Sequence, residues 1–224
     1  MSDPTLDVRE LRAGAGQPAQ SPGVSLWVPS GHLTAVLGGP ASGKSQLLRC
    51  IGLDLAPLSG SVRVDGVEII GATGDRRHHL RSRVVQLVHP PAAAQRERTV
   101  PGSASGFVPP GRRATIPVAG VRQRIQIARA LTQRSRVLLL DEPLTGVDDD
   151  VRTRILELVA RTRAEGGAAV LAATRHPEVA RALGATRVVV LERGAVVESG
   201  SAEAVLGPLR AGRGRWLARR RRSA

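Results

Sequence analysis

A glycine-rich run with a lysine near its end is the strongest chemical signal in the sequence. Residues 38–45 read GGPASGKS and fit the pattern G-x-x-x-x-G-K-[ST]. Glycines let backbone N–H groups approach phosphate oxygens, Lys44 would neutralise charge between the outer phosphates, and Ser45 would ligate Mg²⁺. The run therefore predicts a loop that binds the phosphates of a nucleotide. Its expected contacts are Gly38, Gly39, Pro40, Ala41, Ser42, Gly43, Lys44, Ser45 and Gln46.

Lys44 is the only lysine in the chain, whose formal net charge of +14 comes from arginine. The surplus of alanine, glycine and arginine is typical of a GC-rich genome, in which arginine replaces lysine wherever a positive charge alone is enough. A planar guanidinium does not replace a compact ammonium inside a tight phosphate cradle. The lysine at this position therefore favours phosphate binding over an ordinary glycine turn before a helix.

A second signal is an apolar run that ends in two adjacent carboxylates. Residues 137–140 read VLLL, and Asp141 and Glu142 follow. At a strand end Asp141 would hold Mg²⁺, while Glu142, on the opposite side of the strand, would act as general base. Such a run alone also fits an ordinary strand end. Downstream of a phosphate loop it indicates a P-loop ATPase.

The elements that must position these residues alternate between strand and helix, which predicts an α/β fold with a parallel sheet covered on both faces. Hydrophobic periodicity predicts strands over 6–11, 24–28, 34–38, 62–64, 67–70, 83–88, 136–141, 168–173, 188–191 and 195–198. It predicts helices over 44–53, 120–133 and 149–165. Trp27 lies in an apolar stretch and is predicted to be a core residue.

Composition limits the class of protein. A chain of 224 residues fits one α/β domain and not two. It has no apolar run of about 20 residues that would cross a bilayer, and its first residues resemble neither a secretory signal nor a transit peptide. The single cysteine, Cys50, cannot form an internal disulfide. We therefore expect a protein of the cytoplasm.

Together the motifs resemble the ABC ATPase family in its transporter branch. The likeness extends over nearly the whole length, and the segments 47–54 and 59–60 look most like the lipoprotein-release and macrolide-export group. It rests on the phosphate loop, on LLRCIGLD at 47–54, SG at 59–60, QR at 123–124, IARAL at 127–131, DEP at 141–143 and GVD at 146–148.

The resemblance implies a P-loop NTPase fold of the ABC type, with a mostly parallel core sheet flanked by helices and an N-terminal antiparallel β subdomain. It implies ATP and Mg²⁺ as ligands, a transmembrane permease subunit as partner, and a second ABC ATPase subunit in a head-to-tail dimer. Asp148 would lie at that dimer interface, and the protein would be peripheral on the inner face of the cell membrane. The nucleotide-binding domain would span 1–208, and 209–224 would be a basic tail.

The segment 89–120 departs from the family pattern. It is short and proline-rich, where the family has a helical subdomain, so this subdomain is predicted to be truncated. The signature LSGGQ aligns with PVAGV at 117–121, so that at the dimer interface Val118 offers no hydroxyl and Gly120 is the one remaining glycine. His89 stands at the glutamine of the Q-loop, and Gln86 lies three positions early. His89 could bind a metal-bound water, and a surface histidine is an equally good interpretation.

The switch histidine of the family is replaced by Arg175, with His176 following. A shift of one residue on an extended strand turns a side chain to the opposite face, so His176 takes over only if the backbone bulges. Arg175 could instead clamp the γ-phosphate as a fixed cation. Glu142, Arg175 and His176 are therefore the predicted catalytic residues. The aromatic residue that stacks on adenine in the family is missing from 9–14, which predicts modest nucleotide affinity.

Three functions compete. The leading hypothesis is the ATP-binding subunit of a transporter, with hydrolysis impaired unless a partner subunit supplies an intact signature. The second is a pseudo-ATPase that regulates assembly of a membrane complex. A nucleic-acid-associated ABC protein would explain the net charge of +14. Relatives of that kind carry tandem cassettes or long coiled coils, which this sequence does not have, so no nucleic acid is expected as a partner. The basic cluster at 76–83 is read as a solvated face.

Overall fold

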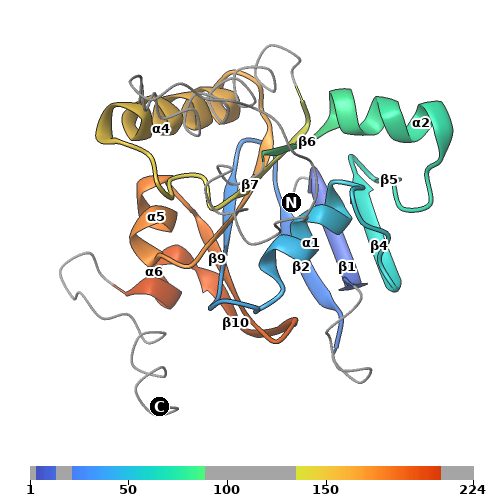
Figure 1. Cartoon of the computed structure of the whole chain (residues 1–224), viewed down its shortest axis with the longest axis horizontal. Helices are drawn as coiled ribbons and strands as arrows, with labels where there is room; N and C mark the ends of the chain where they lie inside the picture. Colours follow the sequence, from blue (N-terminus) through green and yellow to red (C-terminus); the bar gives the residue numbers. More distant parts are fainter. Residues whose placement is uncertain (1–3, 14–21, 89–134, 208–224) are drawn as a thin grey trace, which may run out of the picture.

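A computed structural model describes residues 4–13, 22–88 and 135–207 (Figure 1). The helix predicted at 120–133, the shortened subdomain at 89–120 and the tail at 209–224 lie outside the described residues. Within the described part, the alternation of strand and helix predicted from the sequence is confirmed.

A six-stranded sheet forms the centre of the molecule, in the order β10-β9-β3-β8-β7-β6. Five strands are parallel and β10 runs antiparallel to β9. Every strand that was predicted for this sheet is present. The bounds are Leu33–Leu37 for β3, Val85–Val88 for β6, Val137–Asp141 for β7, Ala169–Thr174 for β8, Arg187–Glu192 for β9 and Ala195–Ser201 for β10.

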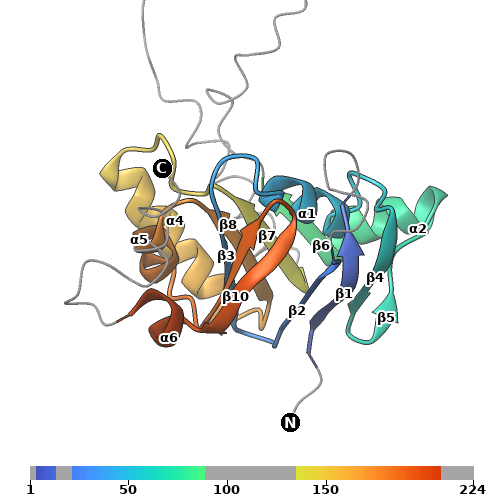
Figure 2. The same cartoon turned by 90° about the horizontal axis from the view of Figure 1, so that it is seen from below.

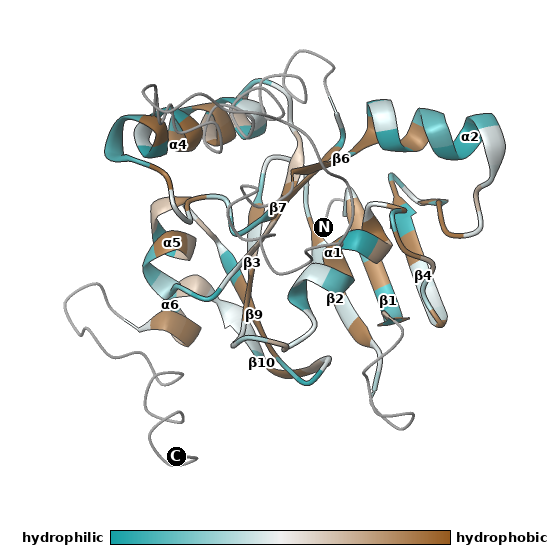
Figure 3. Ribbon diagram, viewed as in Figure 1, coloured by the Kyte–Doolittle hydropathy of each residue, from teal (hydrophilic) through white to brown (hydrophobic). Residues whose placement is uncertain are grey.

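The central strands are buried on both faces, which is why they read as continuous apolar runs. In β7, Leu139 faces one core and Leu138 and Leu140 face the other. β8 alternates in the same way, with Leu171 on the first side and Val170 on the second. The sheet therefore separates two hydrophobic cores, and its apolar strands run through the middle of the molecule in Figure 3.

A second sheet, of four antiparallel strands in the order β2-β1-β4-β5, packs on the first core. Figure 2 shows it beside the central sheet. This confirms the predicted N-terminal antiparallel β subdomain. Its strands are Leu6–Arg12 (β1), Val24–Val28 (β2), Ser59–Val64 (β4) and Val67–Glu68 (β5).

The prediction that Trp27 belongs to the core is wrong. In β2 the inward positions are Val24, Leu26 and Val28, so the alternation of the strand turns Trp27 outward. Its side chain is 42% exposed, and the Arg187 guanidinium lies 5.1 Å from the ring centroid. The indole is thus covered on one face by a cation and not by the core.

Helices cover both faces of the central sheet (Figure 1). α1 (Lys44–Ile51) contributes to the first core, where it contacts β6, β7 and β8. On the other face lie α4 (Asp149–Ala164), α5 (Pro177–Ala182) and α6 (Ala202–Leu206). None of the helices in the described ranges is long and apolar enough to cross a membrane.

Three short helices were not predicted: α5, α6 and α2 (Gly74–His79). Each is under two turns, too short to show a helical repeat of apolar residues. α2 continues into a π-helical turn, Leu80–Val84, so the strand predicted from residue 83 begins at Val85 instead. The basic cluster at 76–83 lies on these two turns. It is more than a solvated face, since Arg77 donates to the Leu53 carbonyl at 2.5 Å and Arg81 pairs with Asp54.

Cys50 lies in α1 and is fully buried. Burial raises the pKa of its thiol to about 11, so the reactive thiolate is scarce at neutral pH. The side chain is a packing residue of the first core.

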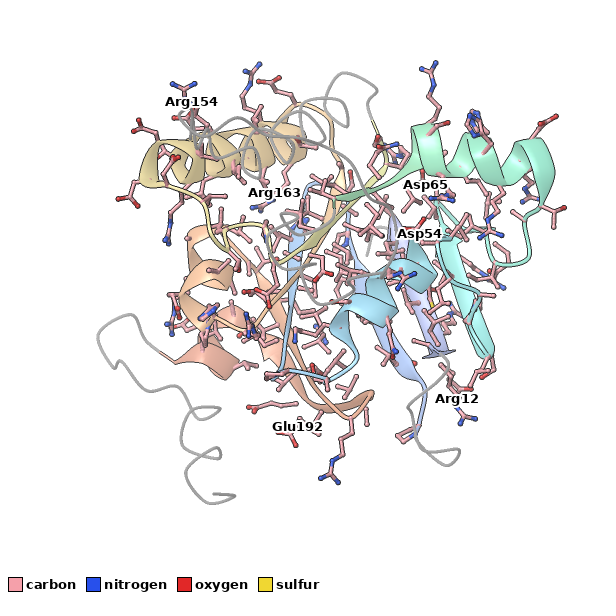
Figure 4. All side chains as sticks on the ribbon, in the orientation of Figure 1. Arg12, Asp54, Asp65, Arg154, Arg163 and Glu192 are labelled. Atoms are coloured by element: carbon pink, nitrogen blue, oxygen red, sulfur yellow. The ribbon has the colours of Figure 1, made fainter. Side chains whose placement is uncertain are left out.

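Arg163, in the last turn of α4, ties three segments together. Its Nε donates to the Gly31 carbonyl at 3.1 Å, and its Nη1 donates to the carbonyls of Leu183 and Gly184, each at 3.2 Å. Burial lowers the pKa of this guanidinium below its ordinary value. Figure 4 shows Arg163 on the side of α4 toward the sheet and Arg154 on the outer side. Arg163 therefore fixes α4 to the start of β3 and to the end of α5.

We expect Arg163→Met to lower the free energy of unfolding by about 1–2 kcal/mol, because three carbonyls lose their shared donor. Chemical denaturation followed by far-ultraviolet circular dichroism measures the change. Arg154→Met is the matched control, since it removes a guanidinium from an exposed position of the same helix. Equal destabilisation by the two variants would contradict the role of the carbonyl contacts.

Candidate functional site

The glycine-rich run forms the turn between β3 and α1, as its motif requires. β3 ends at Leu37 and α1 begins at Lys44. Gly43, the residue before the helix, has φ of 97°, a left-handed conformation that glycine adopts without strain. The turn therefore directs the first N–H groups of α1 toward the space enclosed by the loop.

The Lys44 ammonium lies inside this loop. Its Nζ donates to the carbonyls of Gly38 and Gly39, each at 2.9 Å, and to Ser42 Oγ at 3.1 Å. Lys44 is only 7% exposed. A positive charge is thus held beside the backbone amides at a helix start, which is the electrostatic setting for a phosphate.

Gly38 has no room for a side chain. A Cβ at this position would lie 2.5 Å from the Leu191 carbonyl oxygen and 2.5 Å from Ser42 Oγ. The turn between β9 and β10 supports the loop from the same side, because Gly194 N donates to the Ser42 carbonyl at 2.9 Å. The sequence motif requires glycine here, but it did not reveal that the hairpin after β9 is the support.

The two carboxylates lie at the same edge of the sheet as the loop. β8 lies between β3 and β7, with Leu37 paired to Thr174 and Asp141 paired to Ala173. Because these strands are parallel, the loop after β3 and the residues after β7 and β8 leave the sheet at one edge. Asp141 is buried, with 6% exposed.

Glu142 is held in an unusual backbone conformation. Its φ is 46°, in the left-handed region, and its N–H donates to the Ala173 carbonyl at 2.9 Å. This conformation costs a non-glycine residue about 1–3 kcal/mol and is kept only where the surroundings determine it. The Ala173 contact is one of the interactions that keep Glu142 in this conformation.

Within the described residues, three side chains contact the Glu142 carboxylate. Thr174 Oγ1 and Thr145 Oγ1 are 3.1 Å and 3.3 Å from its Oε2. Arg175 Nε lies 3.3 Å from its Oε1. Sequence reasoning named Arg175 as a phosphate clamp and missed the two threonines. Neither threonine belongs to a contiguous motif, and Thr174 reaches Glu142 only through the register of β7 against β8.

The remaining predicted residues lie in different places. His176 Nδ1 is 3.2 Å from Glu178 Oε1, at the start of α5, so its ring is engaged away from Glu142. Asp148 caps α4, its carboxylate accepting from Val151 N at 2.8 Å; its place at a dimer interface stays a prediction. Gln86 donates to the Arg81 carbonyl at 2.8 Å. His89, Val118 and Gly120 lie outside the described residues.

Ser45 and Asp141 fit a magnesium ion. Ser45 is exposed in the first turn of α1, at the mouth of the loop, and the Asp141 carboxylate ends the buried strand β7. Mg²⁺ prefers hard oxygen ligands and is commonly held by one or two carboxylates together with substrate phosphates. A hydroxyl and a carboxylate at the same sheet edge as the loop match this preference.

Comparison with known proteins points to one family. The family model described as ABC transporter matches residues 22–101. The methionine import ATP-binding protein MetN of Caulobacter vibrioides is 34% identical over an alignment 229 residues long, and the alignment covers 89% of this chain and 67% of that protein. Its counterpart in Thermobifida fusca is 32% identical over 203 residues, which cover 80% of this chain and 63% of that protein. The chain thus spans about two thirds of the length of these relatives.

Solved structures share the fold. A dimeric ATP-binding cassette in a post-hydrolysis state, bound to ADP and phosphate, matches with a TM-score of 0.66 and 21% identity, covering 88% of this chain and 98% of that one. The CbiO1 structure from Clostridium perfringens, part of an ABC transporter complex, matches with a TM-score of 0.64 and 21% identity, covering 90% of each chain. The predicted P-loop NTPase fold of the ABC type is confirmed. The assignment to the export-like group stays a prediction.

We expect Gly38→Ala to lower stability by about 1–3 kcal/mol and to weaken nucleotide binding, because its Cβ meets a backbone carbonyl that cannot move freely. Thermal unfolding with and without ATP measures both effects. Gly200→Ala is the control, since its nearest neighbour is the Val205 side chain at 3.3 Å. A variant at Gly38 that keeps wild-type stability and binding would contradict the tight packing of the loop.

Proposed function

The chain belongs to the ABC transporter family, and on that premise we propose that it binds ATP with Mg²⁺ and couples it to a membrane permease subunit. The observation that carries the proposal is the buried Lys44 ammonium, held by three oxygens of the loop at the start of α1. A phosphate chain lying in this loop would exchange those contacts for its own oxygens. The N–H groups at the start of α1 would add further donors.

The metal and the base have separate positions in this proposal. Ser45 and Asp141 would hold Mg²⁺, which supplies charge neutralisation of the phosphates when bound. Glu142 would orient and deprotonate a water, with its carboxylate placed by Thr145 and Thr174. Asp141 and Glu142, adjacent in sequence, thus serve different partners.

Partners complete the proposal. A second ABC ATPase subunit would close over the nucleotide, and a permease would lie in the membrane above it, so the chain would be peripheral on the inner face of the cell membrane. Relatives are named as methionine import ATP-binding proteins. In this proposal the permease would set the substrate. Because the signature at 117–121 is degenerate, turnover would require a partner that supplies an intact one.

A pseudo-ATPase is the second candidate, and one observation favours it. The Glu142 carboxylate is occupied on both oxygens, by two threonine hydroxyls and by the Arg175 guanidinium. Oxygens that already accept from protein side chains are less available to orient a water. In this reading nucleotide binding alone would regulate assembly of a membrane complex.

We expect Lys44→Ala to weaken ATP binding about tenfold to a hundredfold, because a charge-assisted contact to phosphate is lost. Isothermal titration calorimetry with MgATP measures the affinity. Arg49→Ala is the matched control, since it removes a positive charge from an exposed position of the same helix. If wild-type protein binds no adenine nucleotide, or if both variants lose affinity equally, the proposed site is refuted.

The two candidate functions differ in turnover. We expect the purified chain alone to hydrolyse ATP slowly or not at all, because each site of a homodimer has a degenerate signature. Phosphate release is measured for the wild type and for Glu142→Gln, alone and with an ABC subunit that co-purifies from the native membrane. Glu142-dependent turnover with that partner supports the transporter subunit, and its absence supports the pseudo-ATPase. Fast Glu142-dependent turnover by the chain alone would refute the degraded-site interpretation.

A further inference from the structure

Two arginines from α2 and from the π-helical turn after it hold the far end of α1. The Arg77 guanidinium donates to the Leu53 carbonyl at 2.5 Å, and Arg81 pairs with the Asp54 carboxylate. Both acceptors lie just after α1, the helix whose first residue is Lys44. Figure 4 shows Asp54 between α1 and α2. The helix that begins at the phosphate loop is therefore clamped at its other end.

The clamped end of α1 is firmly placed. Leu53 has φ of 60°, a left-handed conformation that is uncommon for leucine and is kept only where the surroundings determine it. The N–H groups of Asp54 and Leu55 both donate to the Arg49 carbonyl, at 2.8 Å and 3.1 Å. The Asp54 side chain is 14% exposed, whereas that of Arg81 is 48% exposed. Because the acceptors are fixed to α1, a displacement of α1 would pull the arginines with it.

The π-helical turn that carries Arg81 can close in two ways. In this structure the Val85 N–H donates to the Leu80 carbonyl five residues earlier, which is the bond of a π-helix. The Gln86 side-chain amide donates to the Arg81 carbonyl at 2.8 Å, in place of a backbone donor. An α-helical closure would use acceptors four residues earlier, so the two closures differ by one residue. A segment with two discrete closures can respond to a small displacement.

β6 is the element that a change in the turn would reach first. It begins at Val85, the residue that closes the turn, and among the described strands it pairs only with β7. α1 also lies against β6, since a Cβ at Gly52 would be 3.3 Å from the Leu87 Cβ. A strand with one neighbour has fewer contacts to hold it than a strand in the middle of a sheet. Its order therefore depends on what precedes it.

We infer that α2 and the π-helical turn couple the phosphate loop to β6. A nucleotide in the loop fixes α1, and through Arg77 and Arg81 the fixed helix holds the turn in one closure, so that β6 becomes more ordered. Without nucleotide the turn exchanges between its two closures. The coupling gives a role to Gln86 and to the basic cluster at 76–83, which the phosphate chemistry does not use. This inference rests on the proposed function, since it requires a nucleotide in the loop.

Hydrogen–deuterium exchange followed by mass spectrometry tests the coupling without any need for turnover. The exchange of the loop at 38–46 and of the segment 80–88 is compared with and without the non-hydrolysable imido analogue of ATP and Mg²⁺. In the wild type we expect the analogue to slow exchange in both segments, by about threefold to tenfold in 80–88. In the variant Arg77→Met/Arg81→Met the loop should still be protected, while the effect at 80–88 should fall below about twofold.

Arg83→Met is the matched control, because it removes an exposed guanidinium from the same turn that has no partner among the described residues. We expect it to behave as the wild type does. Asp54→Asn removes the ion pair from the other side and should lower the effect at 80–88 by about half. Thermal unfolding verifies that the variants are folded, and Asp54→Asn decides the question if the double variant is not.

Gln86→Leu tests the two closures separately. It removes the amide that closes the Arg81 carbonyl, so without nucleotide the exchange of 80–88 should rise by about twofold to fivefold. Calorimetry with the analogue should show an affinity equal to that of the wild type, since Gln86 does not belong to the phosphate loop. Unchanged exchange in this variant would mean that the turn has a single closure, which overturns the coupling.

Two further results would overturn it. If the analogue protects the loop of the wild type but leaves 80–88 unchanged, nothing is transmitted, and the proposed function stands without the coupling. If 80–88 is protected equally in every variant, the effect reaches β6 through the sheet and not through the arginines. If the wild type neither binds the analogue nor shows a protected loop, the proposed function fails and the coupling with it.

Discussion

The buried ammonium of Lys44 is the constraint on which the site depends. A charged group that leaves water loses several kcal/mol of hydration and must recover it from close polar partners. The loop supplies three oxygens, two of them backbone carbonyls. Backbone carbonyls converge on one point only if the chain turns tightly, and the left-handed Gly43 is part of that turn. Gly38 has no space for a side chain because the Leu191 carbonyl and Ser42 lie against it. The glycines of the motif thus allow the tight turn that brings these carbonyls to the ammonium.

The loop can hold the Lys44 ammonium in this way only because it follows a rigid strand. β3 is buried on both faces and lies between β8 and β9, so its end cannot shift without disturbing both cores. The same sheet brings β7 and β8 to this edge, and with them the carboxylates and Arg175. Arg163, far from the site, contributes by holding α4 against the start of β3. The positions of the site residues are therefore set by packing over the described part of the domain.

A strand or helix could be predicted from the sequence when its pattern of apolar residues was long enough to recognise. The parallel strands were found because burial on both faces leaves an unbroken apolar run, and α4 was found because four turns show a clear repeat. α2, α5 and α6 are too short for a repeat, and their starts depend on tertiary contacts. Trp27 was misplaced because an apolar residue in an apolar stretch was taken as buried, although strand alternation turns every second side chain outward.

In the site, sequence reasoning found the residues whose role is carried by a contiguous motif and missed those whose role comes from pairing. Lys44, Asp141 and Glu142 fall in the first group. Thr174 lies 32 residues from Glu142 along the chain, and only the register of β7 against β8 brings them together. Arg175 falls between the groups: the sequence shows that it replaces a histidine, but not what it contacts. An arginine always carries its charge, and here its Nε lies 3.3 Å from the Glu142 carboxylate. The change of residue type at this one position therefore places a permanent cation beside the predicted general base, where the family has an imidazole.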